Sequence, residues 1–361
     1  MPSTAATQID LFGAEPTVDL REASQDYPRR KAPRGTWSRA TALDPKHRPQ
    51  TPDRPSSTVR REWCRSPQEA HLLDVGNRRY RRLTPDEIAV LQGFDPEWFP
   101  INGLSDWQRV QAIGDSVPPP LAKAVLRGID DVWDWSDRSA IEICAGAGGL
   151  ASAVDGLDGF SHRALIERWE PACTILRNQD GWSRQVAEVD VLDFDFSGLN
   201  GQLGLLSGGP PCQPWSQGGE HGGFDDARDL LQHIPGIVGA TEPEVFVFEN
   251  VPGLASKTNQ PYLRSVMEAL RQPNPRTRYG VMAGIFNAAD FGVPQLRRRL
   301  FLIGFRGSPT ALAHQAFDAI SRHATHRDPG TADASRDPWR TVGDALAGCP
   351  DSGGWRTWVE E

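Results

Sequence analysis

The chain has 361 residues, a formal net charge of −8 and 38% hydrophobic residues, enough for one large domain or a large domain with a small one. It contains no apolar run of about 18 residues and no N-terminal signal pattern, so the sequence predicts a cytoplasmic protein with no membrane segment. The five cysteines are scattered and form no CxxC pair, which argues against a disulfide framework or a metal site and leaves one reactive thiol open.

The charge is distributed unevenly. Residues 1–82 carry 16 Lys and Arg against 10 Asp and Glu, whereas the rest of the chain carries 23 against 37. A basic N-terminal third fits contact with phosphates, and a solvated Arg-rich arm is the alternative. Residues 1–53 are predicted to be a flexible basic arm, because they are rich in Pro, Arg and Ser and lack apolar periodicity. Within it, Gln8-Ile-Asp-Leu-Phe12 resembles the short peptide with which bacterial proteins dock on the DNA polymerase sliding clamp, and a chance amphipathic patch is the other reading.

Two helices are marked at both ends by their sequence. Thr84-Pro-Asp-Glu87 has the form of a capping box with a proline at the first helical position, which predicts a helix that runs to Gln92 and ends at Gly93. The same pattern begins at Ser105 and predicts a second helix that ends at Gly114. A third helix, preceded by prolines, is expected over Leu121–Ile129. The loop from Asp115 to Pro118 would then be fixed by a helix on each side.

From Ser139 onward, apolar strand patterns alternate with helical ones. Strands are predicted at 140–144, 164–167, 185–189, 203–206, 245–248, 279–286 and 300–305, and helices at 150–154, 171–178 and 262–270. Such alternation is typical of an α/β fold with a mostly parallel sheet, whose ligands bind at the carboxyl ends of the strands.

Polar residues and glycines follow several of these strands. Gly146, Gly148 and Gly149 form a tight turn after the first strand, Glu167 ends the second and Asp190 follows the third. Glycines at such a turn admit a nucleotide-like ligand to the backbone, and an acid at the end of the second strand binds ribose hydroxyls. Turn-forming glycines with no ligand are the alternative, because the spacing is GxGG instead of GxGxxG.

The strand at 203–206 ends at Ser207-Gly-Gly-Pro-Pro-Cys212. The glycines permit unusual backbone angles and the prolines fix φ, so the thiol of Cys212 is expected on a stiff, exposed turn. By itself this is also the pattern of a loop with an unimportant cysteine.

Four motifs in the chain together resemble those of the DNA cytosine-5 methyltransferases. They are Ile141-Glu-Ile-Cys-Ala-Gly-Ala-Gly-Gly149, Gly208-Gly-Pro-Pro-Cys-Gln-Pro-Trp-Ser216, Phe248-Glu-Asn-Val251 and Gln295-Leu-Arg-Arg-Arg299. The resemblance extends from about Arg54 to Phe305. It implies a Rossmann-like S-adenosylmethionine-dependent methyltransferase sheet with helices on both faces, and methyl transfer to C5 of a flipped cytosine in double-stranded DNA. A restriction-modification or phage-defence role in the cytoplasm, beside the nucleoid, would follow.

The resemblance also implies the roles of individual residues. Cys212 would add to C6 of the cytosine, Glu249 would contact N3 and the exocyclic amine, and Arg297 and Arg299 would hold the base. The S-adenosylmethionine site would be formed, without a metal, by Cys144, Gly146, Gly148, Gly149, Glu167, Asp190, Pro210, Asp115, Ser116 and Val117.

The motif order departs from the family pattern. The segment with Arg54-Pro-Ser-Ser-Thr-Val-Arg60 and Gln111-Ala-Ile-Gly-Asp-Ser-Val-Pro-Pro119 normally closes the chain, and here it opens it. A circular permutation is the simplest account. It gives residues 54–135 as the permuted segment, 136–306 as the catalytic domain and 307–361 as a short tail. Asp115 replaces an Asn and Cys144 replaces an aromatic residue of the family pattern.

The family's recognition region would be split here between residues 1–53 and the tail, neither of which has the length of a full recognition domain. Low sequence specificity, a minimal recognition module or a second specificity subunit is therefore expected. Three other functions are left open by the sequence: a tRNA cytosine-5 methyltransferase, a non-catalytic DNA-binding subunit of a defence complex, and a cysteine hydrolase. A cysteine hydrolase would need a histidine near the thiol, and the motifs place no histidine of this chain beside Cys212.

Overall fold

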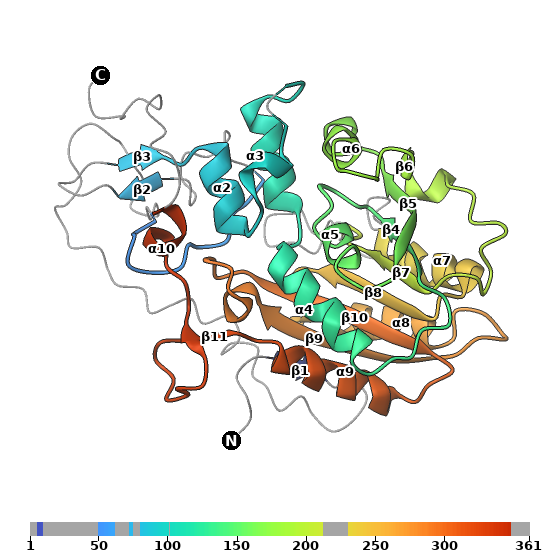
Figure 1. The fold of residues 1–361 in the computed structure, drawn as a ribbon. Coiled ribbons are helices and arrows are strands. Elements are labelled where there is room, and N and C mark those ends of the chain that lie inside the picture. The colour runs from blue at the N-terminus through green and yellow to red at the C-terminus, as the bar shows by residue number, and fades with distance from the viewer. Residues whose placement is uncertain are drawn as a thin grey trace.

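A mixed β-sheet forms the centre of the molecule (Figure 1). The computed structural model describes residues 6–9, 50–61, 72–74, 80–100, 102–211 and 230–347. Five strands are parallel neighbours in the order β6-β5-β4-β7-β8, and β10, β9 and β1 continue the sheet beyond β8 by antiparallel pairing. Their bounds are β1 (Ala6–Ile9), β4 (Ser139–Ile143), β5 (Ser161–Glu167), β6 (Val186–Glu188), β7 (Leu205–Gly208), β8 (Val245–Asn250), β9 (Tyr279–Asn287) and β10 (Arg298–Arg306). The predicted α/β class is confirmed.

Helices cover both faces of the sheet, because alternate strand residues point to opposite sides. In β8, Val245 and Val247 enter the apolar layer under α4 (Pro119–Asp130), α5 (Ala151–Val154) and α9 (Thr310–Arg322). Phe246 and Phe248 enter the opposite layer, with α7 (Ile234–Thr241) and α8 (Gln260–Arg271). α6 (Glu170–Arg177) packs beside β5 and β6.

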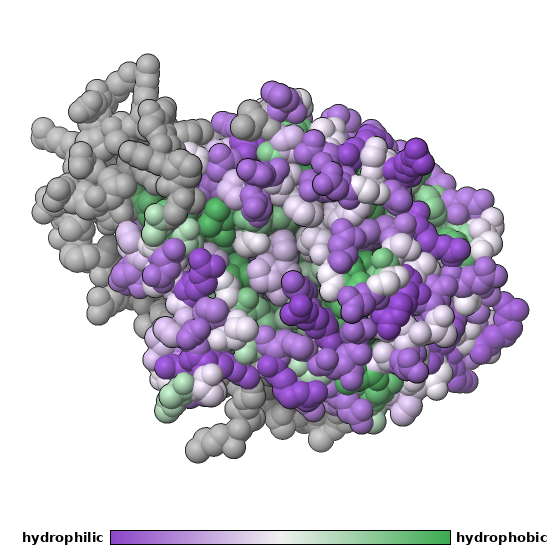
Figure 2. Space-filling view, viewed as in Figure 1, coloured by the Kyte–Doolittle hydropathy of each residue, from purple (hydrophilic) through white to green (hydrophobic). Residues whose placement is uncertain are grey.

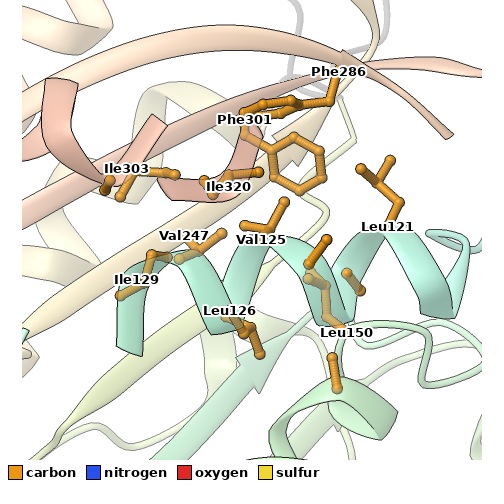
Figure 3. Packing of buried hydrophobic residues seen from close by; sticks show 14 of the residues in the cluster. Leu121, Val125, Leu126, Ile129, Leu150, Val247, Phe286, Phe301, Ile303 and Ile320 are labelled. Atoms are coloured by element: carbon orange, nitrogen blue, oxygen red, sulfur yellow. The ribbon is translucent and has the colours of Figure 1, made fainter. Parts of the chain in front are cut away.

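One of the two apolar layers lies between α4, α9 and the sheet. Figure 3 shows side chains of α4 directed at those of the sheet and of α9; the labelled ones include Leu121, Val125, Leu126, Ile129, Val247, Phe301, Ile303 and Ile320. α9 lies in the segment predicted to be a tail, yet Ala313, Phe317 and Ile320 are fully buried. Residues 310–322 therefore pack as part of the sheet domain.

A smaller lobe combines elements between residues 72 and 115 with a helix near the C-terminal end of the described residues. It contains β2 (Leu72–Asp74), β3 (Tyr80–Arg82), α2 (Pro85–Gln92), α3 (Asp106–Asp115) and α10 (Val342–Leu346) (Figure 1). α10 is attached to the N-terminal segment through hydrogen bonds from Val342 N to Arg54 O and from Gly343 N to Pro52 O, both of 2.9 Å. Short elements elsewhere are η1 (Pro96–Trp98), η2 (Val191–Asp193), η3 (Leu230–His233), η4 (Pro252–Ala255), η5 (Ala288–Phe291), β11 (His326–Arg327) and β12 (Asp337–Pro338).

Both predicted capping boxes are present, at Thr84 and at Ser105. The predicted end of the second helix at Gly114 is wrong, because α3 continues through this residue to Asp115. A Cβ at Gly114 would lie 2.6 Å from the backbone of Arg60 and Arg61. The glycine is therefore required for close packing of another segment, a reason that the local sequence does not contain.

The N-terminal strand β1 lies within the segment predicted to be a flexible arm. It pairs with β9, with Gln8 opposite Gly284. Of the predicted clamp-docking peptide, Gln8 and Ile9 are in this strand, and Asp10 to Phe12 lie outside the described residues.

None of the helices in the described parts of the chain has the length and apolar character that crossing a bilayer requires. On the face shown in Figure 2, hydrophilic residues predominate and the hydrophobic ones form small areas.

The buried carboxylate of Glu244 holds the connection between α4 and β4. Glu244 is 3% exposed and accepts hydrogen bonds from Trp133 Nε1, from both the backbone N and Oγ of Ser136, and from Asp137 N. The ring of Trp133 also packs on Phe305, with centroids 5.4 Å apart.

Replacing Glu244 with alanine should lower the free energy of unfolding by about 3 kcal/mol or more, because four donors lose their acceptor in a buried position. Urea denaturation measures the change. Glu97→Ala, which removes an exposed carboxylate, should change stability by less than about 0.5 kcal/mol. Equal effects of the two substitutions would contradict this structural role for Glu244.

Candidate active site

A pocket lies where the carboxyl ends of β4, β7 and β8 meet the loop after α3. This is where the strand pattern predicted a ligand. The pocket is lined by Asp115, Ser116, Val117, Glu142, Cys144, Ala145, Gly146, Gly149, Leu150, Gly209 and Glu249. Residues from the N-terminal segment and from the sheet domain thus form one site.

The three glycines of the turn after β4 serve different purposes. Gly146 has φ +55° and no atom within 4 Å of a Cβ built on it, so its backbone faces open space in the pocket. A Cβ on Gly148, with φ +82°, would lie 2.6 Å from the ring of Trp182. Gly149 packs against the carbonyl of Val117, which would be 2.0 Å from a Cβ there. Gly146 suits the approach of a ligand, and the other two are needed for packing.

Cys144 begins the turn with φ 51°, a left-handed angle that is unfavourable for a residue with a side chain. Burial, followed by the nearby charge of Glu167, raises the pKa of its thiol well above the ordinary range. Cys144 is therefore a neutral wall of the pocket, unsuited to act as a nucleophile.

Glu167 and Asp190 lie beside the pocket and are not among the residues that line it. Glu167 Oε2 accepts from Gly146 N at 2.9 Å, which ties the acid at the end of β5 to the glycine turn. Asp190 Oδ1 accepts from Leu192 N at 3.1 Å and Oδ2 accepts from Arg168 at 2.9 Å. The bond from Leu192 and the pairing with Arg168 lower the pKa of Asp190, so its carboxylate stays charged.

Glu142 lines the pocket, although neither the strand pattern nor the motifs predicted a role for it. It is 2% exposed, and its Oε2 has no hydrogen-bond partner among the residues that the structure describes. Burial, followed by the charge of Glu167, raises the pKa of Glu142 well above its usual range. The sequence did contain a feature that indicates a functional role for Glu142: it is an acid within the apolar run Ala140 to Cys144. A carboxyl is rarely placed in a buried strand without a partner.

Glu249 and Arg299 form an ion pair at the edge of the pocket. The distance from Arg299 Nε to Glu249 Oε1 is 2.7 Å, and each side chain is 12% exposed. Burial raises the pKa of Glu249, and the charges of Arg299 and Arg297 oppose the rise. Because Glu249 also lines the pocket, a group bound there would lie next to a carboxyl that can hold a proton.

The position of Arg297 differs from that expected for a residue that holds a base. Its side chain is 1% exposed, and it donates hydrogen bonds to the carbonyl oxygens of Val59, Gly114 and Ser116. These contacts make it a link between backbone segments, so of the two arginines only Arg299 contacts Glu249 through its side chain.

Pro210 joins the ends of two strands, because its carbonyl accepts from Asn250 Nδ2 at 3.1 Å. A Cβ on Gly209 would lie 3.5 Å from Glu249 Oε2, so the chain that leads toward residue 212 passes beside Glu249. Cys212 itself lies outside the described residues, and its role stays a prediction.

Comparison with known proteins gives a family. The model of the C-5 cytosine-specific DNA methylases matches residues 20–131 and 139–336. Type II methyltransferase M.NgoMIV of Neisseria gonorrhoeae is 38% identical over 173 residues, which are 48% of this chain and 53% of that protein. Type II methyltransferase M.PspPI of a Psychrobacter species is 37% identical over 46% of this chain and 39% of that protein.

Type II methyltransferase M.AquIA of a Picosynechococcus species is 29% identical over 231 residues, which are 59% of this chain and 90% of that protein. The chain thus spans about half or less of the first two relatives and most of the third. Since the family model covers most of the sequence, the chain belongs to the C-5 cytosine-specific DNA methylase family.

Proposed function

We propose that the protein transfers a methyl group from S-adenosylmethionine to C5 of cytosine in double-stranded DNA, in a restriction-modification system. The observation that carries the proposal is the Glu249–Arg299 pair, which borders a pocket at the carboxyl edge of the sheet in a member of this family. The names of the relatives, type II methyltransferases, support the same reaction. DNA as the substrate would place the protein at the nucleoid.

The pocket suits S-adenosylmethionine on two observations. The buried Glu142 carboxyl, with an unpartnered Oε2, fits the ammonium group of the amino-acid part, and the open space at Gly146 fits an approach to the backbone. Glu167 and Asp190 would hold the ribose and the adenine amino group. When bound, this molecule supplies an electrophilic methyl group.

Substituting Glu142 with glutamine should weaken S-adenosylmethionine binding by about 10- to 40-fold, because a neutral amide oxygen replaces the charged carboxylate as the acceptor for the ammonium group. Isothermal titration calorimetry without DNA measures the affinity. Glu170→Gln, at the exposed start of α6, should leave it unchanged. If Glu142→Gln binds as tightly as the wild type, Glu142 does not contact the ammonium.

The chain's own residues then carry out the base chemistry. The target cytosine must leave the helix stack, at a cost of roughly a few kcal/mol, because C6 is inaccessible inside a duplex. The Cys212 thiolate would form a bond to C6 while the protonated Glu249 gives its proton to N3, which makes the electron pair at C5 available to attack the methyl group; the bond from sulfur to this methyl group breaks, and the donor leaves as a neutral thioether. Loss of the C5 proton to a base, return of the N3 proton to Glu249 and departure of the thiolate would then restore the ring. Arg299 holds Glu249 in place.

Duplex oligonucleotides with 5-fluorocytosine test this function, because fluorine at C5 cannot leave as a proton and the Cys212 adduct persists. A protein–DNA adduct that survives denaturing electrophoresis, formed only with S-adenosylmethionine, is expected. An adduct with tRNA and none with DNA would establish the tRNA alternative. No adduct with either would favour the non-catalytic DNA-binding subunit and refute methyl transfer.

We also propose that the chain is circularly permuted. Two features support this: the family model matches in two separate segments, and residues 56–59 pack against 294–297 although they are more than 230 positions apart. Target recognition would then involve residues 1–53 and 307–361, or a second specificity subunit. Docking of the 8–12 peptide on a sliding clamp would require the pairing of β1 with β9 to be released.

A further inference from the structure

A network of buried polar side chains joins the segment before β10 to the N-terminal part of the chain. Gln295 is fully buried; its Oε1 accepts from Val59 N at 3.0 Å, and its Nε2 donates to Leu91 O at 3.0 Å and to Gln92 Oε1 at 2.8 Å. Gln92, also fully buried, donates from Nε2 to Ser116 O at 2.7 Å. The chain of contacts therefore ends on the loop after α3.

Arg297 reaches the same loop by a second route. One terminal nitrogen, Nη1, donates to Val59 O at 2.8 Å, and the other, Nη2, donates to Gly114 O at 2.8 Å and to Ser116 O at 3.0 Å. All three acceptors are backbone atoms, so the guanidinium fixes the relative positions of two chain segments. Ser116 O thus has two donors, Gln92 and Arg297.

This loop is a wall of the proposed cofactor pocket. Asp115, Ser116 and Val117 line the pocket, and the Val117 carbonyl is in contact with Gly149 of the glycine turn. Because the packing at Gly149 leaves no space, a displacement of the Ser116 carbonyl would alter the distance between this wall and the turn.

We propose that Arg297 is a positioning residue, which together with Gln92 and Gln295 sets the Asp115–Val117 wall and thereby the affinity for S-adenosylmethionine. Arg299, two residues further on, instead holds Glu249 for the chemical step. The identity of the ligand rests on the proposed function, whereas the contacts of Arg297 do not.

Two matched substitutions separate the roles, because lysine keeps the charge and loses the planar fork of donors. Arg297→Lys should raise the Kd of S-adenosylmethionine, measured by calorimetry without DNA, and its KM by about tenfold, with kcat within about threefold of the wild type. Arg299→Lys should leave this Kd unchanged and lower kcat by about 100-fold or more. The opposite split, an unchanged Kd and a lower kcat for Arg297→Lys, would overturn the proposal.

Gln92→Leu provides a variant that keeps Arg297 and removes one donor to Ser116 O. It should raise the Kd several-fold, and an unchanged Kd would also count against the proposal. Thr241→Val is the control, because it removes a buried hydrogen bond to Ile237 O within α7, none of whose residues lines the pocket. The control should lower Tm and leave the Kd of S-adenosylmethionine unchanged. If the control raised this Kd as much as Gln92→Leu does, the effect of Gln92→Leu would be explained by a general loss of stability.

Failure of the proposed function gives a different result. If the wild type binds S-adenosylmethionine and transfers no methyl group, the function is refuted while the affinities of the variants still decide the role of Arg297. If the wild type does not bind S-adenosylmethionine, both proposals are refuted.

Discussion

Cys212→Ser is expected to reduce methyl transfer to DNA by at least about 10⁴-fold, because a serine hydroxyl is not ionised at neutral pH and adds poorly to C6 of cytosine. Binding of S-adenosylmethionine should persist, since serine keeps the size of the side chain and, apart from Gly209, the described residues that line the pocket belong to segments other than the turn that carries Cys212. Transfer of labelled methyl groups to duplex DNA measures the first effect, and calorimetry measures the second.

Cys173→Ser is the matched control for Cys212→Ser. Cys173 is fully buried and its Sγ donates to Glu167 O at 3.3 Å, a bond that serine can also make. Burial, followed by the charge of Glu167, raises the pKa of Cys173 to about 12, so this thiol is not a nucleophile at neutral pH. Methyl transfer should continue in this variant. Normal turnover by Cys212→Ser would exclude the covalent mechanism.

Glu249→Gln is expected to lower kcat by about 10²- to 10⁴-fold, because glutamine cannot give a proton to N3 of the base. Burial raises the pKa of Glu249 above the ordinary value for a carboxyl, and Arg299 opposes this rise. The protonated form of an acid decreases as the pH increases through its pKa. The wild-type rate should therefore fall on the alkaline side of the Glu249 pKa, and the variant should lack this pH dependence.

The pH profile of kcat for the two proteins is the measurement. Glu268→Gln is a suitable control, since this glutamate of α8 has a side chain that is 57% exposed and lies away from the pocket. A Glu249→Gln variant that retained the wild-type rate and pH profile would show that Glu249 is not the proton donor.

The local sequence was sufficient where the structural cause is local. The capping boxes at Thr84 and Ser105 formed as predicted, because a cap depends on residues three positions apart. The strands after Ser139 follow from their apolar patterns, and the glycine turn lies at the predicted carboxyl edge. A resemblance carried by short motifs also predicted the family that the family model confirms.

Causes that depend on distant segments could not be read in this way. Gly114 has the form of a helix terminator and instead admits the backbone of Arg60. Arg297 and Arg299 are the same residue type in the same short motif, and the local sequence does not distinguish their roles. In the structure Arg297 donates to backbone carbonyls, whereas Arg299 forms an ion pair with Glu249.

Within the described residues, the amino-acid sequence by itself determined the secondary structure around the pocket and the chemical types of the groups that line it. Only the tertiary structure decided that Glu142 is a buried acid with an unpartnered oxygen and that Arg297 links backbone segments. The physical reason is that burial and hydrogen-bond partners are set by residues up to 238 positions away, which no local pattern records.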